Sequence, residues 1–234
     1  MPDASRRVGP AFLAALSHEG PGEDLEVAGP SLANARRRQV FRYLCLRPCA
    51  RVGEIGRALS MSQATVRWHE RNLLENGYIE MDGARVFPQG LIDPADAPLF
   101  ALLGALGRDA ALAAVVAEPG IALQDLASRV GLTRQSASKA ATELSEFGLL
   151  SVAEDGRFRR LYATDVLGRK RDANAARVEA FVDRLLRRLT DDGLSPELLR
   201  RDEAVALVRL GAGPRRVVLD LSVDPYRTAW QSRL

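Results

Sequence analysis

The chain has 234 residues, of which 47% are hydrophobic and 27% are charged, and its formal net charge is +3. This mix is ordinary for a soluble globular protein, and the length leaves room for one large domain or two to three small ones. No apolar run approaches the roughly 18 residues that a membrane-spanning helix needs, and no clear cleavage site follows the short N-terminal apolar patch, so we expect no membrane helix, no signal peptide and a cytoplasmic location.

The two cysteines, Cys45 and Cys49, do not make a disulfide framework. Together with His69 they offer three possible metal ligands, but no second Cys or His cluster completes a tetrahedral set. A buried cysteine more commonly serves as a small hydrophobic residue. We therefore expect no metal and no cofactor.

Residues 1–30 predict a partly ordered arm. Its glycines in GPGEDLEVAGP do not follow the phosphate-loop pattern, and no lysine follows them. The next segment, residues 31–90, holds ten arginines and five acidic residues, a surplus of +5. A local basic block on a chain with a pI near 9.2 suggests a polyanionic partner.

Residues 31–93, the first unit, predict three helices followed by a β-hairpin. The first helix ends before Pro48, which cannot sit inside a helix. Ser62 is a natural N-cap for the third helix, and Gly77 is placed as the C′ residue that ends it. The run YIEM-DGA-RVF predicts a hairpin, because Asp-Gly between β-prone runs is a strong turn signal.

A repeat predicts the second unit, residues 107–165. The segment 40–79 aligns without a gap with 111–150, at an offset of 71 residues. Few pairs are identical, but apolar, capping and turn positions recur, with Thr133 as N-cap and Gly148 as C′ residue. Each unit therefore has the element order of a winged helix-turn-helix.

Residues 94–106 predict a connecting segment with an apolar helix from Pro98 to Leu106, packed between the two units and holding them in a fixed relation. This is the part of the linker in which leucine, alanine and phenylalanine dominate.

Residues 166–234 predict a C-terminal helix and a β-hairpin. Residues 172–190 are amphipathic, with one apolar stripe made of Val178, Phe181, Val182, Leu185 and Leu189. The stripe fits either packing onto its own domain or a dimer seam. Residues 204–223 predict a hairpin or small sheet, since VVLDLSV alternates.

The third helix of the first unit resembles a known family. SQATVRWHERNLLENGYI is similar to the recognition helix of ArsR/MarR-like winged-helix regulators, whose pattern is roughly S-x-x-T-V-x-x-H-L-x-x-L-x-x-x-G-L-hydrophobic. The matching positions are Ser62, Thr65, Val66, His69, Leu73 and Gly77. Glu70 departs from the pattern, which usually has a core leucine there. The second unit matches less well and has Ala137, Ala140 and Ala141 at the positions of Val66, His69 and Glu70.

The resemblance covers about residues 31–163, and the tandem arrangement looks like archaeal transcription regulators with two such domains in one chain. It implies an α+β fold, mainly helical with small hairpin wings. The N-terminal arm and the C-terminal region lie outside it.

An α-helix fits the major groove of DNA, where base edges are read by residues near its N-terminal half. The positions that the core does not need on the two third helices are Gln63, Ala64, Arg67, Trp68 and Arg71, and Arg134, Gln135, Ser138, Lys139 and Thr142. Phosphate contacts are expected from Arg36, Arg37, Arg38, Arg85, Arg157, Arg159 and Arg160. A charged outer face is also compatible with plain solvated surface.

Three further residues of the first unit carry separate expectations. His69 should pack against the hairpin or the first helix, and an exposed Trp68 suggests an interface. If Glu70 faces inward it needs a partner such as Arg38 or Arg42.

We therefore expect a sequence-specific, double-stranded DNA-binding transcription regulator with two recognition helices per chain. A homodimer suits the paired half-sites that such regulators bind. The alternatives are an architectural or replication-associated DNA-binding protein, or a tandem winged-helix scaffold for protein interactions like those associated with condensin. An enzyme is not expected, since no nucleophile elbow, phosphate loop or acid/base pair stands out and His18 and His69 are the only histidines.

Overall fold

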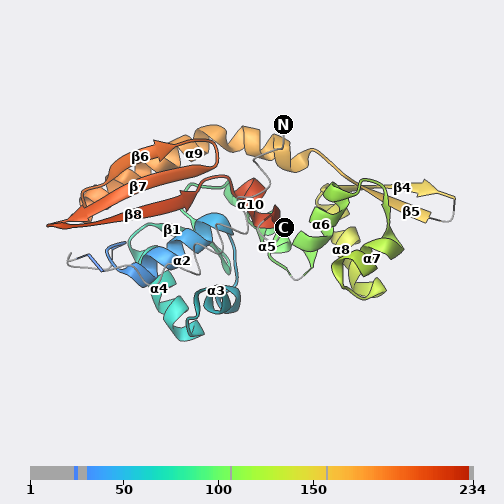
Figure 1. Cartoon of the computed structure of the whole chain (residues 1–234), viewed down its shortest axis with the longest axis horizontal. Helices are drawn as coiled ribbons and strands as arrows, with labels where there is room; N and C mark the ends of the chain where they lie inside the picture. Colours follow the sequence, from blue (N-terminus) through green and yellow to red (C-terminus); the bar gives the residue numbers. More distant parts are fainter. Residues whose placement is uncertain (1–23, 26–30, 106, 157, 232–234) are drawn as a thin grey trace.

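The computed structural model describes residues 24–25, 31–105, 107–156 and 158–231. The predicted arm thus lies outside the described residues, apart from Asp24 and Leu25. The described chain is mainly helical, with small antiparallel sheets of two, three and three strands. This confirms the predicted α+β class. Figure 1 shows two lobes, with one long helix running along the top of the larger lobe.

The first unit folds as three helices and a hairpin: α2 (Ala35–Leu46), α3 (Val52–Leu59), α4 (Gln63–Glu75), β1 (Ile79–Asp82) and β2 (Arg85–Pro88). α2 is the central helix, and nearly all of its residues are buried. α3, α4 and β2 contact it, and so does β8 (Arg215–Ser222), a strand from the C-terminal region. The core of the first unit is therefore completed by residues far along the chain.

The second unit has the same order of elements: α6 (Arg108–Ala117), β3 (Ile121–Ala122), α7 (Leu123–Val130), α8 (Arg134–Glu146), β4 (Leu150–Asp155) and β5 (Phe158–Ala163). α7 and α8 begin and end 71 residues after α3 and α4, and β4 begins 71 residues after β1. The offset found in the sequence is therefore also the offset between equivalent helix boundaries.

Both predicted N-caps are confirmed. The Ser62 hydroxyl accepts a hydrogen bond from the backbone N–H of Thr65 (3.1 Å), and the Thr133 hydroxyl accepts one from that of Ser136 (3.1 Å). Each bond satisfies one N–H group that the first turn of the helix leaves without a partner.

Residues with a left-handed backbone conformation follow equivalent helices in the two units. Gly77 and Gly148 follow α4 and α8 with φ of 66° and 70°, as predicted. Ser60 and Gly131 end α3 and α7 with φ of 52° and 66°. Glycine adopts this conformation at little cost, whereas a serine there is uncommon. Both units therefore have the same turn, but only the second unit has the favoured glycine in it.

The strand β3 is not predicted by the sequence. It pairs with β5 at Ile121 and Leu161, which makes the sheet of the second unit three-stranded. At the corresponding place in the first unit, the N–H of Cys49 donates to the carbonyl oxygen of Val86 (2.9 Å). The segment after the first helix is thus tied to the hairpin in both units.

The connector forms a short 3-10 turn, η2 (Pro94–Asp96), followed by α5 (Ala97–Leu103). The predicted helix therefore begins slightly earlier, and its predicted end, Leu106, lies outside the described residues. Leu99, Phe100 and Leu103 are buried where α5 meets β2, α6 and the C-terminal helix α10 (Pro225–Gln231).

Within the described part of the chain, no single helix is long and apolar enough to cross a membrane. The segments Pro94–Leu103 and Arg108–Ala117 reach that length and composition only when taken together, and they are bent by 84° relative to each other.

The helix α10, which the sequence does not predict, contacts α2, α5, α6 and α9 (Val166–Asp191). The Tyr226 hydroxyl donates to the Asp96 carboxylate (2.7 Å), and the Thr228 hydroxyl donates to the carbonyl oxygen of Leu46 (2.8 Å). The rings of Tyr226 and Phe100 lie 5.0 Å apart. One short helix therefore joins the first unit, the connector and the second unit.

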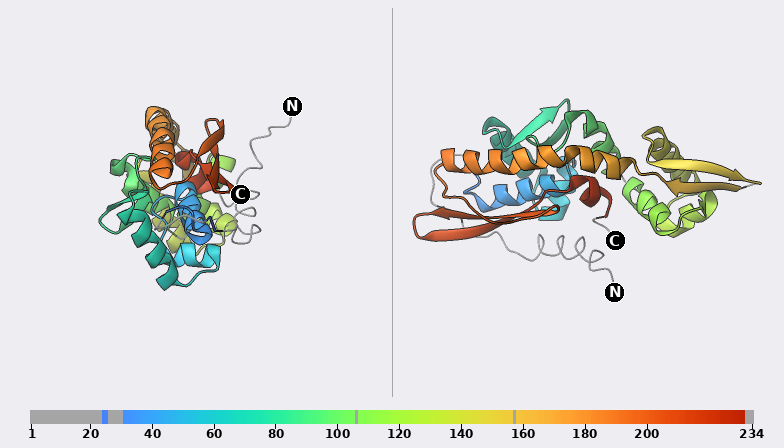
Figure 2. Two further views of the ribbon diagram at one scale, coloured as in Figure 1. Left: turned by 90° about the vertical axis from the view of Figure 1, so that its left-hand side faces the viewer. Right: turned by 90° about the horizontal axis from the view of Figure 1, so that it is seen from above.

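The C-terminal region covers the first unit. α9 starts six residues before the predicted position and is followed by β6 (Glu197–Arg201), β7 (Val205–Ala212) and β8. The predicted hairpin at 204–223 corresponds to β7 and β8, whereas β6 is an additional edge strand. Figure 2 shows α9 and this sheet beside the first unit, while the hairpin of the second unit projects away.

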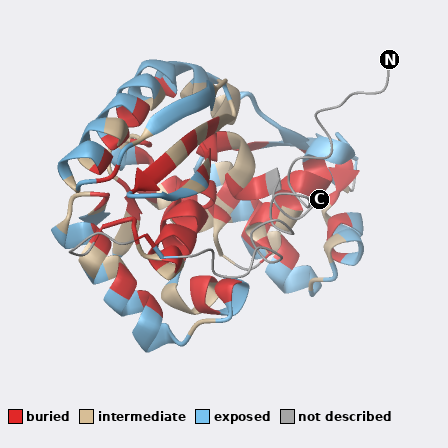
Figure 3. Ribbon diagram, turned by 60° about the vertical axis from the view of Figure 1, so that its left-hand side comes forward, coloured by how far each residue is buried: buried red, intermediate tan, exposed pale blue. Residues whose placement is uncertain are grey.

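The apolar stripe of α9 is not a dimer seam in this fold, so that expectation is corrected. Phe181, Val182, Leu185 and Leu189 are at most 4% exposed within the single chain, and Val178 is partly buried. They belong to the same apolar core as the first unit and the sheet. Figure 3 shows that the outer side of α9 is its exposed side. The alternative, packing onto its own domain, is what the structure shows.

A buried polar cluster joins the two units. Arg47, at the end of α2, lies 2.9 Å from a carboxylate oxygen of Glu54 and 3.5 Å from one of Asp109 at the start of α6. Tyr43 donates to the same oxygen of Glu54 (3.0 Å). Arg47 and Asp109 are 4% and 1% exposed. Charges this deeply buried are tolerated only when they are paired, so the ion pair between Arg47 and Asp109 favours the joined arrangement of the two units.

Replacing Arg47 with Met should lower the free energy of unfolding by about 3–5 kcal/mol, because the buried Asp109 would lose this cation and the half-buried Glu54 would lose its ion pair. Urea denaturation followed by circular dichroism measures the change. Arg67→Met, the same replacement at an exposed site, should change it by at most about 0.5 kcal/mol. Equal losses in the two variants would contradict the role assigned to Arg47.

Candidate nucleic-acid interface

The outer face of α4 is formed by the residues that the sequence predicts. Gln63, Ala64, Arg67, Trp68 and Arg71 are all exposed. The opposite face of the helix packs into the core through its buried residues, Val66, His69 and Leu73. The helix thus presents two arginines, a glutamine and a tryptophan to solvent on a rigid, capped support.

Trp68 lies between the solvent and the start of α2. Its side chain is 52% exposed, its ring is 4.8 Å from the His69 ring in an edge-to-face arrangement, and the Arg37 guanidinium lies 5.5 Å from its centroid. Contact with α2 holds one face of the indole while the other stays exposed. Tryptophan buries much area for little loss of rotamer freedom, which suits a contact residue.

His69 packs inward beside α2, as expected. It is 3% exposed, and its Nδ1 has no hydrogen-bond partner. Burial, helped by the nearby charges of Arg37 and Arg36, lowers the pKa of His69 to about 4. The ring is therefore neutral near pH 7 and serves as part of the core.

The outer face of α8 is the counterpart in the second unit. Arg134, Gln135, Lys139 and Thr142 are exposed and Ser138 is half-buried. A shallow surface depression is lined by these five residues together with Glu143 and Glu146. Lys139 lies 3.9 Å from Glu143, so its charge is partly balanced on the same helix. This face is less basic than a count of its cations suggests.

A groove runs between α8 and the hairpin of the second unit. It is lined by Ser138, Thr142 and Ser145 of α8 and by Val152 and Arg159 of the hairpin, among others. Sequence reasoning did not select Val152 or Ser145. The alternation of the β4 strand places Val152 on a surface where it is 38% exposed, but alternation alone does not tell which surface lines a groove.

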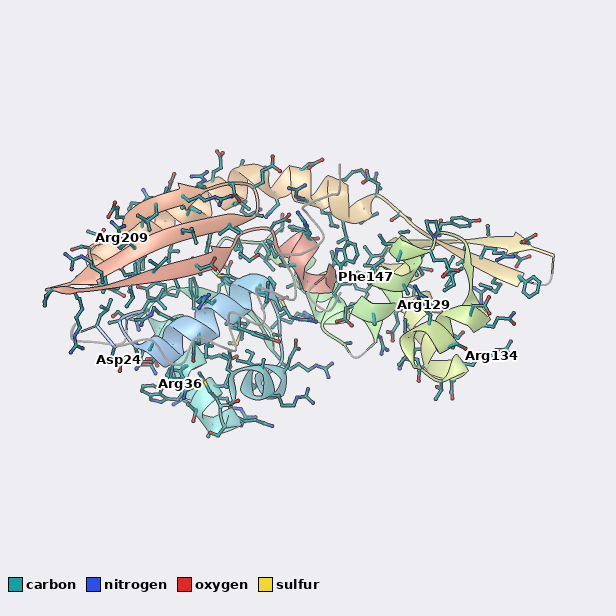
Figure 4. The ribbon with its side chains drawn as sticks, in the orientation of Figure 1. Asp24, Arg36, Arg129, Arg134, Phe147 and Arg209 are labelled. Atoms are coloured by element: carbon teal, nitrogen blue, oxygen red, sulfur yellow. The ribbon has the colours of Figure 1, made fainter. Side chains whose placement is uncertain are left out.

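Two of the predicted phosphate contacts on α2 are wrong. Arg37 and Arg38 are 3% and 6% exposed, and their guanidinium groups donate to backbone carbonyl oxygens of the segment before α2. Arg37 bonds to Ser31 (2.6 Å), and Arg38 bonds to Leu32 (2.9 Å) and Ala33 (2.6 Å). These arginines hold the start of α2 and cannot reach a phosphate. Arg36 is partly exposed, and Figure 4 shows it at the α4 side of α2.

The hairpin arginines differ from one another. Arg85 pairs with Asp82 across the turn (3.2 Å), and Arg160 pairs with Asp155 (3.1 Å) while donating to the carbonyl oxygen of Gly120 (3.2 Å). Arg159 is exposed, and Arg157 lies outside the described residues. The hairpins therefore supply fewer unshared charges than the sequence predicts.

Glu70 forms no ion pair with Arg38 or Arg42, so the expected partner is not found. Arg38 is committed to the carbonyls before α2, and Arg42 contacts Asp220 of β8 (3.7 Å between charged atoms). Glu70 is half-buried on α4, and burial raises its pKa to about 7, with Arg67 acting in the opposite direction. A carboxyl group with this pKa stands where the resembled family usually has an apolar side chain.

The cysteines behave as small hydrophobic residues. Cys45 and Cys49 are both buried and free, and burial raises the pKa of each thiol, to about 12 for Cys49. In the described ranges no group of three or more His, Cys, Asp or Glu residues could hold a metal ion.

Replacing Glu70 with Gln should stabilise the protein at high pH. Glu70 ionises at pH 4.5 when unfolded but near 7 when folded, so the folded state loses stability between these values as pH rises. We expect Glu70→Gln to be more stable than the wild type by about 1–2 kcal/mol at pH 8, a value discounted for partial exposure. The difference should be much smaller at pH 5. Urea unfolding at both pH values tests this, with Glu75→Gln on the exposed side of α4 as control. A difference independent of pH would contradict it.

Comparison with known proteins adds little. No family model matches the chain, and no curated protein matches it. Among solved structures, the DIP2311 protein from Corynebacterium diphtheriae aligns with 14% identity and a TM-score of 0.23, over 55% of this chain and 26% of that one. The chain thus spans about a quarter of that structure, and a similarity this low supports no statement about fold or activity.

Proposed function

We propose that the protein is a sequence-specific, double-stranded DNA-binding transcription regulator in which each unit is a winged helix-turn-helix. α4 and α8 act as the recognition helices, and the two hairpins act as wings. The function needs no cofactor, and the expected location is the cytoplasm.

The observation that carries this proposal is the pair of equivalent, capped helices with exposed polar faces. Each follows a shorter helix through a tight left-handed turn, and each is followed by a hairpin. In Figure 1, α3 and α4 of one lobe and α7 and α8 of the other lie along the same lower side of the molecule. Arg36 and Arg134, labelled in Figure 4, lie on this side as well. Two helices so arranged suit one duplex better than two separate partners.

The chemistry of the exposed residues fits base reading. Arginine pairs with guanine through two hydrogen bonds, glutamine pairs with adenine, and the apolar Ala64 or Trp68 can contact a thymine methyl group. Arg67 and Arg71 lie one turn apart on α4, where both can face a groove. The electrostatic attraction to phosphates is modest, because four of the arginines bind oxygens of the protein itself: Arg37, Arg38, Arg85 and Arg160.

Two alternatives remain distinguishable by experiment. An architectural or replication-associated DNA-binding protein would show shallow sequence preference and a strong salt dependence. A protein-interaction scaffold would bind no DNA at all. A homodimer is still expected from paired half-sites, but it must use a surface other than the apolar stripe of α9.

Arg67→Ala and Arg71→Ala should each weaken binding to the preferred site by about 1–3 kcal/mol and reduce discrimination against other sequences. Selection of binding sites from random DNA followed by mobility-shift titration provides the measurement. Arg187→Ala, at an exposed position on α9, is the control and should bind like the wild type. No preferred site, or no effect of either α4 variant, would exclude the proposal.

The salt dependence should reveal how many charges contact phosphates. With Arg36, Arg67, Arg71, Arg134, Lys139 and Arg159 as the candidates in each chain, the slope of log K against log salt should be roughly −5 or shallower per bound chain. Arg36→Ala should reduce its magnitude by about 1 per bound chain, while Arg187→Ala should leave it unchanged. A slope near −10 per bound chain would mean that other surfaces bind the duplex.

A further inference from the structure

A cavity of about 390 Å³ lies where α9, the β6–β7 turn and the start of α10 meet. This is within the size range of small-molecule sites. It lies on the C-terminal region, away from α4 and α8, and the interface described above uses none of its residues. Neither the repeat nor the family resemblance extends to this region.

The cavity lining is acidic. Five carboxylates, Asp172, Glu179, Asp202, Glu203 and Asp224, face two guanidinium groups, Arg171 and Arg201. Arg171 pairs with Glu203 (2.9 Å) and lies 2.9 Å from Oδ2 of Asp224. Arg201 pairs with Glu179 (3.3 Å). Asp202 pairs with Arg200, which is not part of the lining (2.6 Å). Five carboxylates are thus set against three guanidinium groups, and a surplus of negative charge remains.

Two deeply buried side chains of the lining carry acceptor oxygens without a donor. Asn174 is 4% exposed, and its amide donates to the carbonyl oxygen of Leu91, but its Oδ1 has no hydrogen-bond partner. Asp224 is 3% exposed, and its Oδ1 has no partner either. Its Oδ2 makes an ion pair with Nε of Arg171 (2.9 Å). Leaving buried acceptors unpaired is costly, and a native fold rarely does so without a reason.

Burial raises the pKa of Asp224, and the charges of Arg171 and Arg227 act in the opposite direction. The effect of burial outweighs that of both cations. A second cation near Oδ1 would stabilise its ionised form.

We propose that this cavity binds a small organic cation that carries N–H donors, with Asp224 Oδ1 and Asn174 Oδ1 as the acceptors. An ammonium group supplies both the charge that the lining lacks and the donors that the two oxygens lack. The negative surplus disfavours an anion, and the charged lining disfavours an apolar ligand. In the part of the chain that the structure describes, no cluster of three or more His, Cys, Asp or Glu residues could hold a metal ion.

The site adjoins the helix that joins the two units. Asp224 immediately precedes α10, whose Tyr226 and Thr228 bond to the connector and to α2. A ligand held by Asp224 therefore acts on the element that sets how the units are joined, and we expect it to change DNA affinity. This second step rests on the proposed function, whereas the site itself does not.

The site is tested by isothermal titration of the whole protein, without DNA, with putrescine, agmatine and n-butylamine, and with butyrate and n-butanol as charge-reversed and neutral analogues. We expect saturable one-to-one binding of the ammonium and guanidinium compounds and none of the analogues. Asp224→Asn should weaken binding about ten-fold or more, the loss of one charge-assisted hydrogen bond. Asp172→Asn, an exposed lining position that leaves the core intact, should weaken it several-fold.

Asp191→Asn is the matched control, because Asp191 is exposed at the far end of the same helix. Absence of saturable binding by all three cations, binding of butyrate with equal affinity, or equal affinities in the wild type, Asp172→Asn and Asp191→Asn would each overturn the site.

The coupling is tested by mobility-shift titration with and without the tightest-binding cation. A change in DNA affinity in the wild type that is absent in Asp224→Asn supports it, because any direct effect of the amine on DNA would persist in the variant. An unchanged affinity overturns the coupling alone. Cation binding by a protein that binds no DNA would instead exclude the proposed function and leave the site standing.

Discussion

The arrangement of this molecule depends on buried charge at the junction of its two units. Arg47 cannot stay in the interior without Glu54 and Asp109, and these carboxylates come from both sides of the junction. Separating the units would break the buried ion pair between Arg47 and Asp109, whereas Arg47 and Glu54 belong to the same unit and would stay together. The junction is therefore closed by electrostatics, while α10 and α5 fill it with apolar side chains. If both faces meet one duplex, their spacing is set here rather than by a flexible linker.

Much of the fold was predictable because its signals are local. Capping hydroxyls, helix-ending glycines and prolines act within a few residues, so the 71-residue offset in sequence reappears in the helix boundaries. The exposure of Arg67, Trp68 and Arg71 followed for the same reason: the core positions of an amphipathic helix fix which residues remain outside. Helix boundaries and exposed helix positions, which follow from local signals and from the spacing of apolar residues, agree with the structure.

Inferences that depended on tertiary packing did not agree with the structure. Arg37 and Arg38 look like surface residues in any hydrophobicity pattern, yet both are buried and donate to the carbonyl oxygens before α2. The α9 stripe was ambiguous because an apolar face looks the same whether its partner is another chain or a sheet formed later in its own sequence. β6 and α10 were missed since an exposed edge strand lacks alternation and a seven-residue helix carries little periodicity. Glu70 is a different case. The sequence shows that it departs from the pattern of the resembled family, but only the structure shows what surrounds its side chain.

The contact between α2 and β8 has a consequence for how the chain assembles. Arg42 and Asp220 are in contact although they are 178 residues apart in the sequence. The whole second unit lies between them in the sequence. Topologically, the second unit is an insertion into a body made of the first unit and the C-terminal region. Its own contacts are short in sequence, so it can form early, whereas the surrounding body must close a long loop and is the slower part to fold. Insertions with this layout tolerate replacement of the inserted part, which makes the loops on either side of the second unit natural places for evolution to have exchanged one inserted unit for another.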